Sequence, residues 1–231
     1  MDYKLIRPFG PTIYHSTMRE EFMDILKEIA EESRVSGVDF SKNLAGNIKK
    51  EVLWSTGSAI QKNEFYHELL PHIKTYTEAE AERFASHLLN RSEYDAHHSE
   101  EADKVFGYTF STEPWINFQQ ANEFNPTHSH TGMLSSVLYI DVPEVIAEEA
   151  KHSKSNMACA GQIEFHYGPN VLGVNGTHKI VPKTGDILLF HAELNHSVYA
   201  FKSDVERISM SFNVGNITHG SLIPTETGIK F

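Results

Sequence analysis

The sequence predicts a mainly β fold with helices near the N-terminus, and three observations support this prediction. Segments with helical periodicity occur before the polar run Asn90–Asp103. From Val105 onward, short aromatic and β-branched runs alternate with Gly, Pro and Asn turns. The last run, Arg207–Val214, alternates between apolar and polar residues. Many short strands at this spacing are typical of a β-sandwich or barrel.

The N-terminal part begins with two short strand segments and continues into a helix. Tyr3–Ile6 and Thr12–Tyr14 are β-rich and are separated by Pro8, Gly10 and Pro11. Thr17-Met18-Arg19-Glu20 has the spacing of a capping box, which predicts a helix start. The apolar residues of this helix recur at helical period: Phe22, Ile25, Leu26, Ile29 and Ala30.

Two further helices are predicted after an ambiguous stretch at Asp39–Lys62. Glu64–Lys74 places Phe65, Leu69, Leu70 and Ile73 on one side of a helix. A second capping box, Thr77-Glu78-Ala79-Glu80, predicts the start of another helix. Its inward residues would be Ala81, Phe84, Ala85 and Leu88.

The C-terminal half contains nine β-rich runs. They are Val105–Phe110, Trp115–Phe118, Leu134–Val142, Gln162–Tyr167, Val171–Val174, His178–Val181, Ile187–Phe190, His196–Phe201 and Arg207–Val214. Asn175-Gly176 between two of them is the strongest hairpin signal. In the last run, Ile208, Met210 and Phe212 alternate with polar residues, so one face packs on a core and the other is polar. A polar inner face implies a ligand.

Composition limits the function. The 231 residues fit a single domain over 1–231, with a helical support region that includes short strands at 1–104 and a β core at 105–231. The net charge of −11 argues against nucleic acid and anionic membranes as partners. Cys159 is the only cysteine, so no internal disulfide is expected. No signal-peptide core or membrane span is found, which predicts a cytoplasmic protein. The oligomeric state is not predicted.

A histidine pattern predicts a metal site in the β half. His128 and His130 are two residues apart, and strand periodicity would place their side chains on one face. His196 follows the short apolar strand at Ile187–Phe190, so it would come from a second strand or its terminal loop. Three imidazoles from two strands could form a facial site with open coordination positions. In isolation, a His-Ser-His would more often be a surface or core pair.

Five motifs together resemble the 2-oxoglutarate- and Fe(II)-dependent oxygenases over roughly Trp115–Val214. They are Trp115-Ile116-Asn117, Asn125-Pro126-Thr127-His128-Ser129-His130, Ser136-Val137-Leu138-Tyr139, Phe190 to His196, and Glu206-Arg207-Ile208-Ser209-Met210-Ser211-Phe212-Asn213. The likeness is nearest to a subgroup often found in phages and marine bacteria, which would place a phage-encoded protein in the host cytoplasm.

The resemblance implies a double-stranded β-helix (jelly roll, cupin-like) core flanked by helices. It implies Fe(II), 2-oxoglutarate as cosubstrate and O₂, with His128 and His196 as iron ligands. Arg207 would bind the distal carboxylate of the oxo acid, since its planar fork suits a carboxylate. Tyr139 and Ser209 would assist by hydrogen bonding, and Asn117 could hold the near carboxylate or a water. The expected reaction is hydroxylation of a peptidyl residue or a small molecule.

One departure from the family pattern leaves alternatives open. Most relatives carry a carboxylate where this chain has His130, so the third ligand is His130, a carboxylate such as Glu164, or water. Arg207 could instead form an ion pair with Glu206, Glu193 or Asp204. Two other functions are consistent with the pattern: a cupin-like three-His dioxygenase that does not use 2-oxoglutarate, or a non-catalytic phage-type protein. The segment 143–160 could be a lid or a surface insertion.

Overall fold

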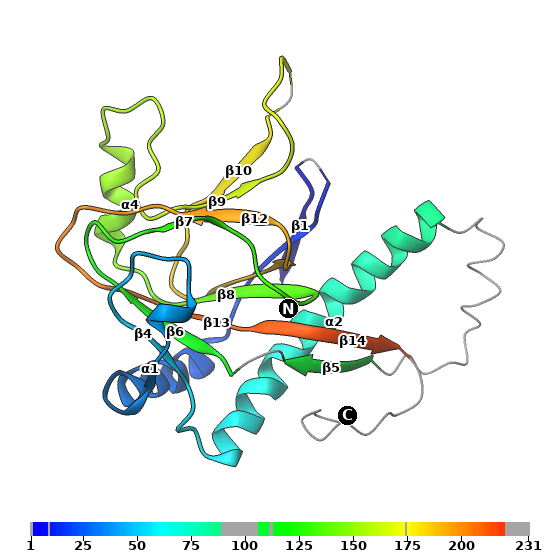
Figure 1. The fold of residues 1–231 in the computed structure, drawn as a ribbon, viewed down its shortest axis with the longest axis horizontal. Coiled ribbons are helices and arrows are strands. Elements are labelled where there is room, and N and C mark those ends of the chain that lie inside the picture. Colours follow the sequence, from blue (N-terminus) through cyan, green and yellow to red (C-terminus); the bar gives the residue numbers. More distant parts are fainter. Residues whose placement is uncertain (1, 9, 89–105, 111–112, 174, 220–231) are drawn as a thin grey trace.

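The computed structural model describes residues 2–8, 10–88, 106–110, 113–173 and 175–219. Two antiparallel sheets form its centre, and helices cover the outer face of the larger sheet (Figure 1). This arrangement agrees with the predicted mainly β fold. No helix among the described residues has the length and hydropathy needed to cross a membrane.

The large sheet collects strands from both ends of the chain. Its order is β1 (Tyr3–Ile6), β2 (Ile13–Thr17), β11 (Asp186–His191), β8 (Leu134–Asp141), β13 (Arg207–Ser211), β6 (Trp115–Gln119), β4 (Glu51–Leu53) and β3 (Val38–Asp39). β14 (Asn213–His219) pairs with β8 and with β5 (Phe106–Phe110). The N-terminal region therefore supplies edge strands on both sides of the sheet.

The small sheet faces the large one and carries most of the histidine motif. Its order is β10 (Thr177–Ile180), β9 (Ile163–His166), β12 (Asn195–Val198) and β7 (Asn125–His128). Apolar side chains from both sheets fill part of the space between them, among them Tyr139 of β8, Phe165 of β9 and Phe190 of β11. The two sheets thus form the double-stranded β-helix, whose interior is apolar at one end and polar at the other.

Two helices pack on the outer face of the large sheet. They are α1 (Glu20–Ser36) and α2 (Ala59–Leu88). Leu26 of α1 and Phe65 of α2 are fully buried in one cluster with Met210 and Phe212, the apolar face of the last strands. A short helix, α4 (Glu144–Lys151), follows β8, and a 3₁₀ turn, η1 (Ser41–Asn43), precedes β4. Burial of these apolar stripes, more than local propensity, stabilises the helices.

Neither predicted capping box starts a helix. Thr17 is the last residue of β2, and α1 begins after Arg19, whose side chain makes no capping hydrogen bond. Thr77 lies inside α2, where its Oγ1 donates to the carbonyl of Ile73 at 2.8 Å. The two helices predicted at 64–74 and from Thr77 are one helix that also contains Pro71, because packing on the sheet overrides the local signals. The side chains that were predicted to point inward after Thr77 are not among those described. The run Asn90–Asp103 lies outside the described residues.

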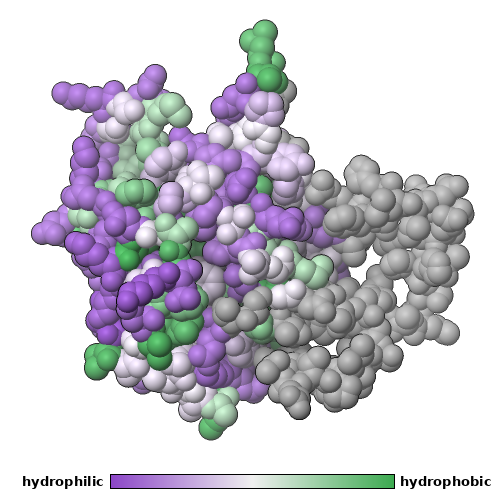
Figure 2. Space-filling view, in the orientation of Figure 1, coloured by the Kyte–Doolittle hydropathy of each residue, from purple (hydrophilic) through white to green (hydrophobic). Residues whose placement is uncertain are grey.

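The predicted strands are mostly found, with two differences. The run Arg207–Val214 is divided at Phe212 into β13 and β14, which lets the chain change pairing partners. The described part of the predicted run Val171–Val174, residues 171–173, forms no strand; Val174 lies outside the described residues. The β9–β10 hairpin closes at the pair His166 and Thr177. Asn175-Gly176 is therefore the end of a longer loop and not a two-residue turn. Figure 2 shows a hydrophobic tip on this hairpin, where Val171 and Leu172 are exposed.

Candidate metal centre and cosubstrate pocket

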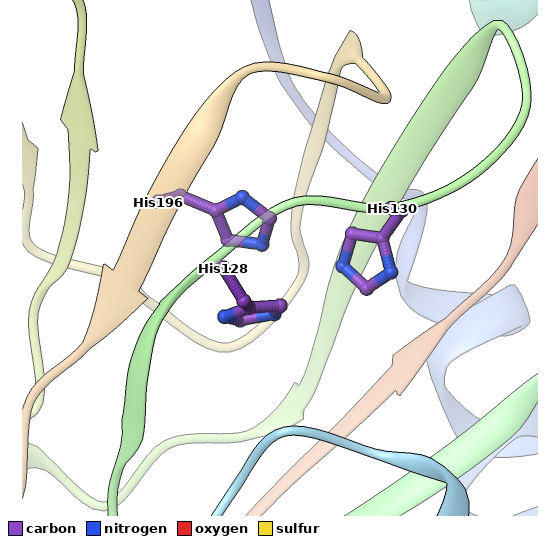
Figure 3. Close-up of side chains that lie close together, drawn as sticks. All are labelled: His128, His130 and His196. Carbon is purple, nitrogen blue, oxygen red and sulfur yellow. The ribbon is translucent and has the colours of Figure 1, made fainter.

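Three histidines converge between the two sheets (Figure 3). His128 ends β7, and His196 lies directly opposite it on β12, so the two side chains share one face. His130 follows β7, and its backbone N–H donates to the carbonyl of Ala192 at 2.8 Å. Potential ligand atoms of the three rings all lie within 4.8 Å of one another. The sequence pattern predicted this convergence from two strands.

Backbone carbonyls orient two of the imidazoles. Nδ1 of His128 lies 2.7 Å from the carbonyl of Pro126, and Nδ1 of His196 lies 2.9 Å from that of Leu194. A carbonyl can only accept, so Nδ1 carries the proton in both rings and Nε2 is left with its lone pair. In metal-binding histidines, a hydrogen bond from the ring nitrogen that does not bind the metal fixes the tautomer and the ring angle.

The surroundings keep all three rings neutral. Burial lowers the pKa of His128. It also lowers the pKa of His130 to about 4 and the pKa of His196 to about 3. The neighbouring histidines lower the values for His130 and His196 further. A metal ion needs the neutral imidazole, so this donor set fits a divalent ion of the iron, nickel or zinc type.

Glu164 does not join the three histidines. On β9 it lies opposite Ser197, whereas Phe165 lies opposite His196, so the Glu164 side chain points to the other face of the sheet. There its carboxylate accepts a hydrogen bond from the Tyr199 hydroxyl and lies 4.0 Å from Lys179 Nζ. No carboxylate belongs to the candidate metal cluster within the described part of the chain.

Arg207 lies in the same cavity and is only 3% exposed. Its Nη1 donates to the carbonyl of Gly161 at 2.5 Å, and its Nη2 donates to Gln119 Oε1. Its Nε has no hydrogen-bond partner among the described residues. Glu206 pairs with Arg34 instead, at 2.6 Å, and no described carboxylate forms an ion pair with Arg207. A buried guanidinium without a counter-ion is costly, and an anion bound beside it would lower this cost.

Polar groups on three neighbouring strands surround this arginine. Ser209 lies opposite both Asn117 and Tyr139, so the three share the inner face of the large sheet. Asn117 Nδ2 donates to Ser209 Oγ at 3.5 Å, while Asn117 Oδ1 and the Tyr139 hydroxyl are buried without partners. Burial raises the pKa of Tyr139 to about 12, so its hydroxyl remains a donor at neutral pH. Orphaned buried polar atoms of this kind are expected where a ligand binds.

One cavity of about 180 Å³ is lined by all seven residues that the sequence singled out. They are Asn117, His128, His130, Tyr139, His196, Arg207 and Ser209. A second set, which the sequence analysis did not find, lines the same cavity: Asn43, Leu44, Ala45 and Ile48. These come from the segment 41–48, which contains η1 and precedes β4. Its mixed polar sequence gave no regular pattern. The one local signal was Gly46, where a Cβ would lie 1.7 Å from Asn125 Oδ1.

The segment 143–160 is not a lid over the cavity. It contains α4, and none of its residues lines the cavity. The Glu149 carboxylate instead accepts hydrogen bonds from the backbone N–H groups of Lys202 and Ser203, which fixes α4 to the surface. The surface interpretation of this segment therefore agrees with the structure, whereas residues of the segment 41–48 do line the cavity.

Comparison with solved structures shows the fold. The non-heme α-ketoglutarate-dependent carbocyclase SnoK from nogalamycin biosynthesis is 12% identical with a TM-score of 0.53, over 87% of this chain and 78% of that chain. HygX from Streptomyces hygroscopicus, solved with nickel and 2-oxoglutarate, is 9% identical with a TM-score of 0.50, over 88% of this chain and 82% of that chain. A 2OG-Fe(II) oxygenase family oxidoreductase from Burkholderia pseudomallei is 13% identical with a TM-score of 0.34, over 50% of this chain and 47% of that chain. This chain thus spans less than half of the Burkholderia protein.

Comparison by sequence gives one family match, over the β half of the chain. No curated protein matches the chain significantly. Residues 113–213 match a family described as "Putative 2OG-Fe(II) oxygenase", and this stretch contains all seven residues singled out above. These comparisons do not bear on the narrower likeness to phage and marine-bacterial members. Over residues 113–213, a little less than half of its length, the chain is therefore similar to the 2-oxoglutarate- and Fe(II)-dependent oxygenases.

Proposed function

We propose that the protein hydroxylates an unactivated C–H bond of a peptidyl or small-molecule substrate. The observation that carries this proposal is a single cavity in which three neutral imidazoles lie together with a buried arginine that has no counter-ion. His128, His130 and His196 would bind Fe(II). The bound iron, with 2-oxoglutarate as reductant, activates O₂ for attack on the substrate.

The charge of the site favours an anionic cosubstrate. Three neutral imidazoles leave the full charge of Fe(II) uncompensated, in contrast to a site with a carboxylate ligand. Arg207 adds a further positive charge, and the cavity is lined by no Asp or Glu among the described residues. A dianionic oxo acid neutralises much of this charge. The site therefore disfavours a cationic substrate and accepts a neutral or anionic one.

Arg207 and its neighbours would hold the far end of the oxo acid. Its Nε, which has no partner among the described residues, and the Tyr139 hydroxyl can donate to a carboxylate. Ser209 and the Asn117 amide extend this polar surface towards the histidines. Gln119 and Gly161 keep the guanidinium in place before the ligand arrives, which reduces the ordering cost of binding.

The remaining parts of the proposal concern partners and location. With a net charge of −11, the protein is not expected to bind nucleic acid or anionic membranes. We propose a cytoplasmic location from the single cysteine, which lies outside any disulfide.

The donor set without a carboxylate also favours one alternative, a cupin-like three-His dioxygenase that does not bind 2-oxoglutarate.

The two functions differ in the binding of 2-oxoglutarate. Under anaerobic conditions, Fe(II) and 2-oxoglutarate should produce a weak visible charge-transfer band in the wild-type protein. Arg207→Ala should weaken 2-oxoglutarate binding by about 100-fold, because a buried charge-assisted pair is lost, and should leave metal binding unchanged. Arg19→Ala, at an exposed arginine outside the cavity, is the matched control. A band of equal strength in Arg207→Ala, or none in the wild type, would favour the cupin-like alternative.

A further inference from the structure

A row of polar side chains crosses the inner face of the large sheet and ends at a buried acid. Ser209 lies opposite Tyr139 on one side and opposite Asn117 on the other, and Asn117 lies opposite Glu51 of β4. Residues that are directly opposite in an antiparallel ladder point to the same face, with Cβ atoms about 4.5–5.5 Å apart. Val52, the next residue of β4, lies on the outer face in the helix-covered core. Glu51 therefore continues this row one residue beyond Asn117, the last of its members that lines the cavity.

The carboxyl group of Glu51 is buried without a partner. The residue is 0% exposed, and neither side-chain oxygen has a hydrogen-bond partner among the described residues. The backbone of Glu51, in contrast, is fully engaged: its N–H donates to Ser41 Oγ at 3.1 Å, and its carbonyl accepts from Phe40 N at 2.8 Å. The local structure thus fixes the main chain of Glu51, on the same face of the sheet as Asn117, and leaves its acid group without a hydrogen-bond partner among the described residues.

The charged groups around Glu51 do not compensate a carboxylate. Asp39 of β3 and Glu123 in the turn after β6 are both acidic. The nearest cation on the inner face of β13, Arg207, is already held by Gln119 and Gly161. Burial, and after it the charges of Glu123 and Asp39, raise the pKa of Glu51 to about 7. An unpaired carboxylate in such surroundings takes up a proton and becomes a hydrogen-bond donor.

The nearest orphaned acceptor in this row belongs to Asn117. Its Oδ1 is buried without a partner, while its Nδ2 already donates to Ser209 Oγ. We propose that Glu51, as a neutral acid, donates a hydrogen bond to Asn117 Oδ1 and so fixes the amide of Asn117 with its Nδ2 directed at the cosubstrate. Glu51 is then a positioning residue that acts through Asn117. This inference rests on the proposed function, because it assigns the Asn117 amide to 2-oxoglutarate binding.

The arrangement makes cosubstrate affinity depend on pH. Below neutral pH, Glu51 is protonated and holds the amide. As the pH rises through the pKa of Glu51, the carboxylate loses its proton, repels Oδ1 and no longer holds the amide. Affinity for 2-oxoglutarate should then fall by about fivefold, the effect of losing one ordinary hydrogen bond.

Calorimetric titration of 2-oxoglutarate into the Mn(II)-loaded protein, at about pH 6 and about pH 8.5, tests this inference on either side of the midpoint. Wild-type protein should bind more weakly at the higher pH. Glu51→Gln keeps a donor that does not titrate, so its affinity should be equal at both pH values. Glu51→Ala should bind weakly at both. Glu164→Gln removes a buried acid that faces away from the cavity, and should retain the wild-type pH dependence.

Infrared difference spectra of metal-free wild-type protein and Glu51→Gln provide a readout that does not need the cosubstrate. A band of a protonated carboxyl group should be present at the lower pH and absent at the higher one. Equal pH dependence of 2-oxoglutarate affinity in the wild type and Glu51→Gln, or no such band, would overturn the role of Glu51 while leaving the proposed function intact. Absence of 2-oxoglutarate binding at either pH, with the band present, would instead overturn the proposed function and with it this inference.

Discussion

At the scale of single residues, the site combines three candidate metal ligands with a pre-positioned cation. The three imidazoles are kept neutral by burial, and two of them are oriented by the carbonyls of Pro126 and Leu194. Arg207 remains buried because Gln119 and Gly161 accept its hydrogen bonds without cancelling its charge. Neutral acceptors can position a guanidinium and still leave it free to attract a carboxylate, whereas an acidic partner would compete with the ligand.

Gln119 is therefore expected to control cosubstrate affinity without contacting the metal. Replacing Gln119 with Ala removes the acceptor of Arg207 Nη2 and lets the guanidinium adopt other positions. We expect the Kd for 2-oxoglutarate to rise about tenfold, since hydrogen bonds to charged groups contribute roughly 1.5–3 kcal/mol and water can replace part of this. Titration of the Mn(II)-loaded variant measures the change.

The neighbouring residue provides a matched control for this experiment. Gln120 has the same side chain, but its Nε2 donates to Glu206 at the surface and not to Arg207. Gln120→Ala should retain wild-type affinity. Equal affinities of the Gln119→Ala variant and the wild type would show that Gly161 alone is sufficient to hold Arg207.

At the scale of elements, packing decided where helices begin and which segment borders the cavity. The segment 41–48 lies against the turn before β7, where Asn47 N donates to the carbonyl of Phe124 at 2.8 Å. Glycine is required at Gly46, because a Cβ there would lie 1.7 Å from Asn125 Oδ1. This close approach brings Asn43 and Leu44 to the cavity. Such an approach depends on a residue far along the chain, so no local pattern predicts it.

Gly46→Ala should displace this segment. We expect a loss of about 1–3 kcal/mol in the free energy of unfolding, which is typical of overpacking at a closely packed position. Urea denaturation gives this value. The double variant Gly46→Ala/Asn125→Ala removes the amide that the new methyl group would meet, and it should recover much of the loss. If the two substitutions are additive, the contact between these residues is not the cause.

At the scale of the whole molecule, the helices and the cavity occupy opposite faces of one sheet. The apolar residues of β13 pack under α1 and α2, while its polar residues line the cavity. Arg34 of α1 also pairs with Glu206, the residue before β13, at 2.6 Å. The helical layer thus supports the strand that carries Arg207, and global stability depends on the apolar contact between helix and sheet.

Leu26→Ala tests this contact. The side chain is fully buried between α1 and the sheet, so its truncation should reduce the free energy of unfolding by about 2–5 kcal/mol. Val35→Ala, on the same helix at a position that is 89% exposed, should change it by less than about 0.5 kcal/mol. Thermal or urea unfolding of both variants gives the comparison, and similar small effects would show that α1 contributes little to the core.

Glu51 should make the stability of the whole fold depend on pH. Its pKa is raised from 4.5 to about 7 on folding, so the unfolded chain holds fewer protons between these values. The stabilising contribution of protonated Glu51 is complete below about pH 4.5 and is lost as the pH rises through about 7. Since each pKa unit corresponds to 1.36 kcal/mol, the loss is roughly 3 kcal/mol.

Glu51→Gln should not show this loss. The stability of the variant relative to the wild type should therefore increase between about pH 5 and about pH 8 and then remain level. Urea denaturation of both proteins across this range measures the difference. A difference that is constant over the range would indicate that Glu51 titrates with an ordinary pKa in the folded protein.

The sequence by itself determined the features that depend on local patterns. Strand alternation identified the two faces of Arg207–Val214, because a side chain's direction within a strand follows from its neighbours along the chain. The spacing of His128 and His130 predicted that their rings lie together, but β7 ends at His128, and His130 is placed by the loop that follows, where its N–H donates to the carbonyl of Ala192. The tertiary structure decided what depends on distant partners: the merger of two predicted helices into α2, the position of Glu164 away from the metal cluster, the contact of Gly46 with Asn125, and the placement of Glu51 opposite Asn117. These depend on register between strands and on packing between layers, which become fixed only when the whole chain is folded.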